Sequence, residues 1–257
     1  MINQDFILLI FNCEKYRYKA LKQKETWLQQ LPPNIIYYHV LGRKQDQDQE
    51  SREKNKNKDY VINEQERVLY VNTEDDYNSL PKKVIAAYKA INDIFKFKYI
   101  FKTDDDQELT NLRFLNILMN ILNNNNNNTK SHYGGHIVDV KQPYKSDYYR
   151  IHPELPKNVI LNVTKYCNGR FYFLSWEAIQ ILIERITNIQ KEYFEDYAIG
   201  INLPLKLKDN ILQLDTNKYF KDFNLSIFAE RISNLPLMLS EGQPKVEPKV
   251  ETKVEPK

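Results

Sequence analysis

The sequence contains little glycine, cysteine or histidine. Its 257 residues include 6 glycines, 2 cysteines and 4 histidines. So few glycines argue against a glycine-rich phosphate-binding loop and against a repeat architecture. Cys13 and Cys167 are too few for a disulfide framework or a zinc cluster, and the simplest interpretation is two buried free thiols. His132 and His136 flank two glycines, which favours a turn over a zinc site.

Long hydrophobic runs are absent as well. The apolar run at residues 6–11 has about the length of a buried strand, whereas a membrane-spanning helix needs about 20 apolar residues. The run lacks the basic flank and the small residues of a secretory signal. We therefore expect no transmembrane segment and a cytoplasmic location.

Neither sign of charge dominates the chain. It has 37 Lys and Arg residues against 34 Asp and Glu residues, a net charge of +3. This balance gives no reason to expect a nucleic-acid partner. Hydrophobic residues make up 42% of the chain and aromatic residues 12%, which is enough to bury a sizeable core. The composition therefore predicts a folded protein.

Three segments interrupt the hydrophobic pattern. Residues 43–59 contain no apolar side chain, residues 123–130 contain a run of asparagines, and residues 241–257 repeat lysine, valine, glutamate and proline. We interpret the first two as flexible loops and the third as a disordered tail. The remainder predicts a single domain over residues 1–240.

Strand-like and helix-like patterns alternate within this domain. Apolar runs predict strands over residues 6–11, 35–41, 68–71, 97–101 and 171–174. Helix-like segments lie between them. This alternation predicts an α/β fold, with a mainly parallel central sheet flanked by helices on both faces. The ligand site of such a sheet lies beyond the carboxyl ends of its strands.

The helices themselves have recognisable starts and faces. Ser79, Thr110 and Ser175 are placed to cap the helices that follow them. Leu21 and Leu28 recur at helical spacing in the first helical segment and are expected on its buried face.

Three consecutive acids, Asp104, Asp105 and Asp106, directly follow a predicted buried strand. Adjacent carboxylates repel one another, and a bound cation relieves that repulsion. A hard divalent ion prefers carboxylate oxygens and keeps positions open for substrate phosphates. An extended turn can direct two alternate carboxylates toward one ligand and the middle one away. The alternative interpretation is a solvated turn that caps the next helix.

An acidic pair, Glu195 and Asp196, lies within an aromatic and aliphatic segment. A partly desolvated carboxylate has a raised pKa and is suited to accept a proton from a hydroxyl nucleophile. The alternative is a local ion pair, or acids at the start of a helix. A third acidic cluster, residues 74–76, precedes the Ser79 helix, whose positive end explains it.

Five segments occur in a distinctive order over about residues 6–200. They read ALKQKETW at 20–27, EDDYNSLPKK at 74–83, KYIFKTDDD at 98–106, YCNGRFYFLS at 166–175 and EDYAIG at 195–200. Together they resemble the beta-1,3-glycosyltransferase family, which includes galactosyltransferases, N-acetylglucosaminyltransferases and the Fringe proteins. The third segment resembles the family's DxD motif, and the last resembles its Glu-Asp-Val-x-x-Gly segment.

The resemblance implies a GT-A fold and an inverting hexosyltransferase that moves a sugar from a UDP-sugar to an acceptor hydroxyl, with Mn²⁺ or Mg²⁺. Its partners would be that donor and a glycan or glycoprotein acceptor. By position, it implies that Asp106 and Asp104 hold the metal and that Asp196 is the general base. It also implies that further residues contact the sugar nucleotide: Asp104, Asp105, Lys83 and Glu195.

The sequence departs from the family pattern. No histidine follows Asp196, where the family has a metal ligand, so Asp215 or water would have to substitute. Ser79, Pro81 and Phe171 replace residues of the family motifs. The family's membrane anchor is not expected here, so a Golgi location does not carry over.

The source of the protein and two alternative functions stay open at the level of the sequence. A soluble form fits a bacterium or a large DNA virus that glycosylates in the host cytoplasm, and the asparagine run favours the virus. The first functional alternative is a non-catalytic descendant that binds sugar nucleotides or glycans. The second is a nucleotidyltransferase, which would release pyrophosphate rather than UDP.

Overall fold

The computed structural model describes residues 1–42, 58–124 and 130–223. The predicted tail, residues 224–240 of the predicted domain and most of both predicted loops lie outside the described residues. Residues 1–222 form one unit. Asn123 and Asn124 belong to a helix, so the predicted loop at 123–130 begins two residues too early. None of the helices in the described ranges has the length and apolar character needed to cross a membrane.

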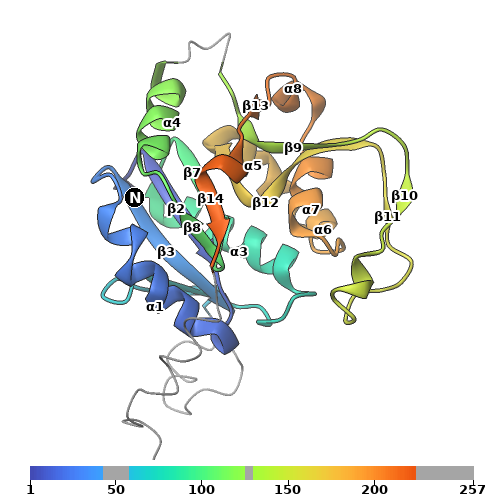
Figure 1. Ribbon diagram of the computed structural model, residues 1–257, viewed down its shortest axis with the longest axis horizontal. Helices are drawn as coiled ribbons and strands as arrows, with labels where there is room; N and C mark the ends of the chain where they lie inside the picture. The colour runs from blue at the N-terminus through green and yellow to red at the C-terminus, as the bar shows by residue number, and fades with distance from the viewer. Residues whose placement is uncertain (43–57, 125–129, 224–257) are drawn as a thin grey trace, which may run out of the picture. The chain divides into compact units, whose positions relative to one another are not determined.

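One mixed sheet of eight strands lies at the centre of the fold (Figure 1). In chain order its strands are β2 (Phe6–Phe11), β3 (Ile35–Gly42), β4 (Tyr60–Asn63), β5 (Val68–Val71), β7 (Tyr99–Asp104), β9 (Tyr133–Val140), β12 (Thr164–Ser175) and β13 (Leu212–Gln213). Across the sheet they are ordered β13-β9-β12-β7-β2-β3-β5-β4. The four strands from β7 to β5 are parallel, whereas β12 and β4 are antiparallel to their neighbours in the sheet. The predicted α/β fold with a mainly parallel central sheet is confirmed.

Helices cover both faces of this sheet. One face carries α3 (Leu80–Ile94), α5 (Trp176–Glu184), α6 (Ile186–Ile189) and α7 (Glu195–Asn202), whose apolar residues share one core with Ile7, Leu9 and Tyr172. The other face carries α1 (Arg17–Glu25) and α4 (Arg113–Asn124). On that face Phe114 meets the ring of Phe171 at 5.4 Å between centroids. Alternate residues of each strand point to opposite faces, so apolar runs such as β2 bury both sides.

Shorter elements complete the described chain. They are β1 (Ile2–Asn3), η1 (Glu14–Tyr16), η2 (Trp27–Gln30), β6 (Phe95–Lys96), β8 (Gln107–Leu109), β10 (Tyr144–Lys145), η3 (Tyr148–Arg150), β11 (Ile160–Leu161), α8 (Leu205–Lys208), α9 (Thr216–Tyr219) and β14 (Phe220–Asp222). β10 and β11 pair beyond the long strands β9 and β12 (Figure 1), while β14 pairs with β8 next to the acid triplet.

Of the three predicted side-chain caps, one is confirmed. Ser175 caps α5, because its Oγ accepts the N–H of Ala178 at 3.3 Å. Ser79 stands before α3 but makes no side-chain cap; instead Asp76 Oδ1 accepts the Ser79 N–H at 2.7 Å. Thr110 does not cap α4, which begins only at Arg113.

The predicted buried face of the first helix is wrong at Leu21, which is 54% exposed. α1 ends at Glu25, and the 3-10 helix η2 then changes the angular spacing between residues. As a result Trp27 and Leu28 reach the core while Leu21 faces outward.

The predicted turn at Gly134 and Gly135 is also wrong, because both residues lie inside strand β9. A Cβ on Gly134 would lie 2.4 Å from the ring of Phe173, and one on Gly135 would lie 2.8 Å from Cys167 Cβ. The glycines therefore allow close packing against β12 rather than a turn. Cys167 is a buried free thiol as predicted, whereas Cys13 is free but only half-buried.

Candidate functional site

The acid triplet lies at the carboxyl end of β7, the edge where the sequence places the ligand site. Asp104 ends the strand, and Asp104 and Asp106 are partly exposed. Asp105 points the other way, and its Oδ1 accepts a hydrogen bond from Lys19 Nζ of α1 at 2.9 Å. The triplet therefore presents its first and third carboxylates at the surface and holds the second in a buried ion pair.

Lys102 connects this strand end to the acidic pair on α7. Its Nζ lies 2.6 Å from Asp104 Oδ1, 2.7 Å from the Gly169 carbonyl and 3.0 Å from Glu195 Oε2. Its side chain is 1% exposed. An ammonium has three donors, so these three acceptors use all of them.

The two acids at the start of α7 occupy different environments. Glu195 is buried, with Oε2 at Lys102 and Oε1 accepting from the Tyr172 hydroxyl. Asp196 is partly exposed, and its Oδ2 accepts the Gly169 N–H at 3.1 Å. Its Oδ1 accepts the N–H of the next residue, Tyr197, at 2.8 Å.

Desolvation dominates the electrostatics of these carboxyls. Burial raises the pKa of Asp104 to about 6, although Lys102 opposes the shift. Burial also raises the pKa of Asp105 to about 6, against the pull of Lys19. The pKa of Asp196 is raised, first by burial and then by the charge of Asp104, while Lys102 and two backbone N–H groups lower it. Such a carboxyl is a better proton acceptor than an exposed aspartate.

A stack of three rings lies within the electrostatic influence of both groups of acids. The His152 ring stacks on Tyr77 with centroids 4.0 Å apart and on Tyr148 with centroids 5.1 Å apart. Burial raises the pKa of the Tyr148 phenol, and the negative charges of Asp196, Asp104 and Asp106 raise it further. One phenol thus experiences the charges of both acidic segments, which are ninety positions apart in sequence at Asp106 and Asp196.

The residues around Asp106 suit a hard cation only in part. Asp106 Oδ1 accepts from Gln107 Nε2 at 2.8 Å, and the same amide donates to Asp222 Oδ1 of β14 at 2.8 Å. Asp215 is exposed just before α9. In the described ranges, no group of three or more His, Cys, Asp or Glu side chains is arranged to hold a metal ion. Asp104 and Asp106 still fit Mg²⁺ or Mn²⁺ of the kind that keeps its remaining positions for water and substrate phosphates.

Lys83 lies in a buried cluster of its own. Its Nζ is 2.5 Å from Asp75 Oδ1 and 2.8 Å from the Asn12 carbonyl, and both charged side chains are 3% exposed. The Asp75 carboxylate also accepts the N–H groups of Gly42 at 2.9 Å and Glu14 at 2.6 Å. This cluster ties together the ends of β2 and β3 and the start of α3.

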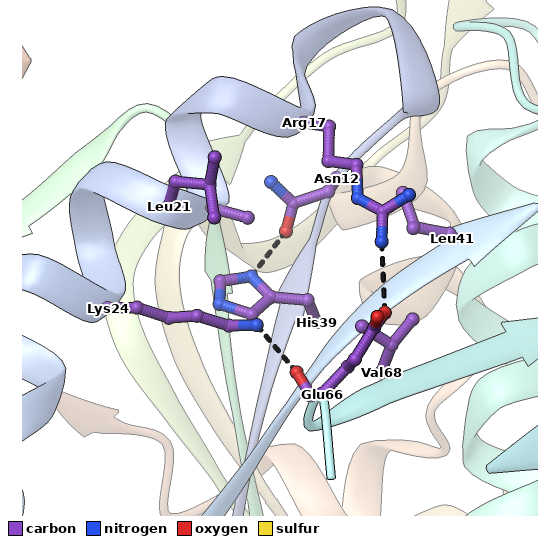
Figure 2. Close-up of a pocket in the computed structure, with 9 residues that line it drawn as sticks. Asn12, Arg17, Leu21, Lys24, His39, Leu41, Glu66 and Val68 are labelled. Atoms are coloured by element: carbon purple, nitrogen blue, oxygen red, sulfur yellow. Dashed lines mark hydrogen bonds and ion pairs between the residues drawn. The ribbon is translucent and has the colours of Figure 1, made fainter. Parts of the chain in front are cut away.

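A cavity of about 180 Å³ lies under α1, beside this cluster and apart from the acids (Figure 2). Its lining includes His39, whose Nδ1 pairs with Asn12 Oδ1 at 2.7 Å, and Lys24, which donates to the Glu66 carbonyl at 2.5 Å. His39 Nε2 and Asn12 Nδ2 are buried without a hydrogen-bond partner in the described structure. A cavity of this size has room for a water molecule, which could pair with these two atoms.

Residues 19–209 match the family model described as Galactosyltransferase. The chain belongs to the galactosyltransferase family. This membership supports a glycosyltransferase that acts on a sugar donor and an acceptor, and it agrees with the GT-A fold implied by the sequence. It gives no support to a viral origin. No sequence among curated proteins matches the chain.

Three solved structures resemble this family member weakly. A 4-diphosphocytidyl-2C-methyl-D-erythritol synthase is 13% identical with a TM-score of 0.43, covering 90% of this chain and 99% of its own. The Francisella tularensis 2-C-methyl-D-erythritol 4-phosphate cytidylyltransferase is 12% identical with a TM-score of 0.42, covering 90% and 100%. Mouse xyloside xylosyltransferase 1 is 10% identical with a TM-score of 0.35, covering 83% and 86%.

Several residues of this galactosyltransferase-family site do not follow from reasoning about single motifs. Gly169 and Lys102 stand inside the matched segments at 166–175 and 98–106, but nothing in the sequence shows that they meet. Tyr148 and His152 lie in a stretch for which the sequence analysis predicts neither a helix or strand nor a motif. The signal for Lys102 was its position two residues before Asp104 on a buried strand, where a lysine requires a partner.

Proposed function

We propose that this protein is an inverting, metal-dependent hexosyltransferase that moves a sugar from a UDP-sugar to an acceptor hydroxyl of a glycan or glycoprotein. The observation that carries the proposal is the link between the two acidic segments. Lys102 Nζ lies 2.6 Å from Asp104 Oδ1 and 2.7 Å from the Gly169 carbonyl, and the Gly169 N–H donates to Asp196 Oδ2 at 3.1 Å. Family membership supplies the reaction class.

Asp196 acts as the general base in this proposal. The acceptor oxygen attacks the anomeric carbon while the bond from that carbon to the diphosphate breaks and UDP leaves with the bonding electrons. The acceptor proton goes to a carboxylate oxygen of Asp196. Its raised pKa favours that transfer, and a positioned base of this kind contributes about 10²- to 10⁴-fold in rate.

Asp104 and Asp106 are the proposed ligands of Mn²⁺ or Mg²⁺, with Asp104 also facing the nucleotide. A divalent ion there would offset the charge that develops on the leaving diphosphate. The resemblance also implies contacts with the sugar nucleotide for Asp105, Lys83 and Glu195. Their charged groups already have partners in the protein, namely Lys19, Asp75 and Lys102. A cytoplasmic location and a viral source stay predictions.

Release of UDP from a panel of UDP-sugars with Mn²⁺ tests the base. We expect Asp196→Asn to lower release by at least about 100-fold. Asp139→Asn, an exposed acid on β9, is the control and should behave like the wild type. Unchanged release in Asp196→Asn would remove this residue from the role of base.

Calorimetry with UDP tests the metal. Wild-type binding should strengthen when Mn²⁺ is added, and Asp106→Asn should abolish that dependence. Binding without turnover over all donors and acceptors would instead favour the non-catalytic alternative, which the missing histidine motivates. Release of pyrophosphate would favour the nucleotidyltransferase.

A further inference from the structure

Glu195 turns inward, away from the surface. Only 5% of the residue is exposed, and both carboxylate oxygens are occupied, one by Lys102 and one by Tyr172. The Tyr172 hydroxyl in turn lies 2.7 Å from that of Tyr88 on α3. The side chain therefore fixes the first residue of α7 to β7, β12 and α3 together.

The backbone opposite Asp196 is fixed by the same lysine. β12 loses its register with β9 between Cys167 and Tyr172, and Gly169 lies in this irregular stretch. Its carbonyl accepts from Lys102, and its N–H donates to Asp196. Irregular strand positions of this kind often lie beside active sites, where they redirect a group.

We propose that Lys102 and Glu195 are positioning residues for Asp196, and that Glu195 makes no contact with the sugar nucleotide. Lys102 holds the Gly169 backbone and Glu195 holds the start of α7, so the Gly169 N–H meets one oxygen of Asp196. The other oxygen, Oδ1, accepts the N–H of Tyr197 and keeps a second lone pair for the acceptor hydroxyl. This inference rests on the proposed function and replaces the donor-binding role that the resemblance implies for Glu195.

The competing explanation is a buried ion pair that serves stability alone. Buried pairs do not by themselves raise stability, because desolvation offsets their attraction. The two explanations differ in what they predict for activity. A positioning residue acts through Asp196, so its substitution lowers turnover when Asp196 is present. The same substitution lowers turnover no further in a variant that already lacks the Asp196 carboxylate.

Glu195→Gln is the main test, because glutamine preserves the size of the side chain and removes its charge. UDP affinity by calorimetry should stay within about threefold of the wild type. Turnover, measured as UDP release from the most active donor of the panel, should fall about 10- to 100-fold, the loss typical of a catalytic group displaced by about 1 Å. A tenfold loss of UDP affinity with unchanged turnover would make Glu195 a donor ligand and overturn the proposal.

The double variant Glu195→Gln with Asp196→Asn separates positioning from general stability. Its residual turnover should equal that of Asp196→Asn alone within a factor of about two, since groups that act as a unit are not additive. Losses that multiply would show that Glu195 acts independently of Asp196, which contradicts the proposal. If Asp196→Asn alone retains full turnover, the proposed function fails first, and the UDP affinity of Glu195→Gln still shows whether Glu195 binds the donor.

Tyr172→Phe gives the same test where Glu195→Gln does not fold. It removes the hydroxyl that holds Glu195 Oε1 but keeps the aromatic ring in the core. We expect lower turnover with UDP affinity within about threefold of the wild type. Lys98→Met, which removes a half-exposed lysine just before β7, should leave both unchanged. Wild-type turnover in Tyr172→Phe would overturn the proposal.

Discussion

The backbone N–H of Gly169 donates to Oδ2 of Asp196 at 3.1 Å. Gly169 belongs to β12 and Asp196 to α7. The residues next to them in the sequence therefore do not predict this contact. A hydrogen bond to one oxygen of a carboxylate fixes its plane and lowers its pKa at the same time. The proposed base is therefore oriented by a backbone group, which Lys102 in turn holds through the Gly169 carbonyl.

Substitution of Gly169 by alanine tests this arrangement. The added Cβ would lie 3.2 Å from Lys102 Nζ and 3.4 Å from Asp104 Oδ2, so at least one of these groups must shift. We expect UDP release to fall about 10- to 100-fold. Lys165→Ala, an exposed position on the same strand, is the matched control. Wild-type release by Gly169→Ala would show that the close approach of this backbone is not needed.

The raised pKa of Asp196 predicts an acid limb in the rate profile. A base works only when deprotonated, so UDP release should fall as the pH drops through this pKa. Burial raises the pKa of Asp196, which places the limb above the value of about 3.9 for an exposed aspartate. Initial rates from pH 4 to pH 8 measure the limb. A profile that is flat down to pH 4 would disagree with an Asp196 base.

The buried pair of Lys83 and Asp75 predicts a large loss of stability in Lys83→Met. Removal of the ammonium leaves a carboxylate that is 3% exposed without its charged partner. Breaking a buried pair in this way costs about 3–5 kcal/mol. The control is Lys98→Met, whose ion pair with Asp5 is half-exposed and should contribute no more than about 1 kcal/mol. Urea unfolding of both variants gives the comparison, and equal midpoints would contradict the assignment.

His39 predicts a stability that declines in acid. Burial, together with the charge of Lys24, lowers the pKa of His39 to about 3, so the folded protein keeps it neutral. The unfolded chain takes up a proton below about pH 6.5, and stability contributed by the neutral ring is lost as the pH falls from there toward 3. At pH 4.5 this loss is about 3 kcal/mol.

His39→Gln isolates that contribution from other titrating groups. The raised pKa values of Asp104 and Asp105 act with the opposite sign over the same pH range. The decisive quantity is therefore the difference in unfolding free energy between wild type and His39→Gln. It should shrink between pH 7 and pH 4.5, and a constant difference would show that His39 does not titrate as expected.

Much of the fold follows from local pattern. Residues 6–11 and 68–71 are strands at the predicted positions, because short continuous apolar runs rich in β-branched and aromatic residues favour a buried strand. The helix after Ser79 is α3 at the predicted residues, since its apolar spacing is strongly periodic. Errors arose where packing overrides pattern, as at Gly134, whose close approach to Phe173 depends on a distant strand.

The sequence by itself determined the α/β class, the acid triplet at a strand end and the acidic pair within an apolar segment, because each depends on residues within about ten positions of one another. Only the tertiary structure decided that Glu195 turns toward Lys102 while Asp196 turns toward Gly169 and the surface. Adjacent residues of a helix point in directions about 100° apart. Which of two neighbouring acids is buried thus depends on where the sheet supplies a cation, and that partner lies 93 positions earlier in the chain.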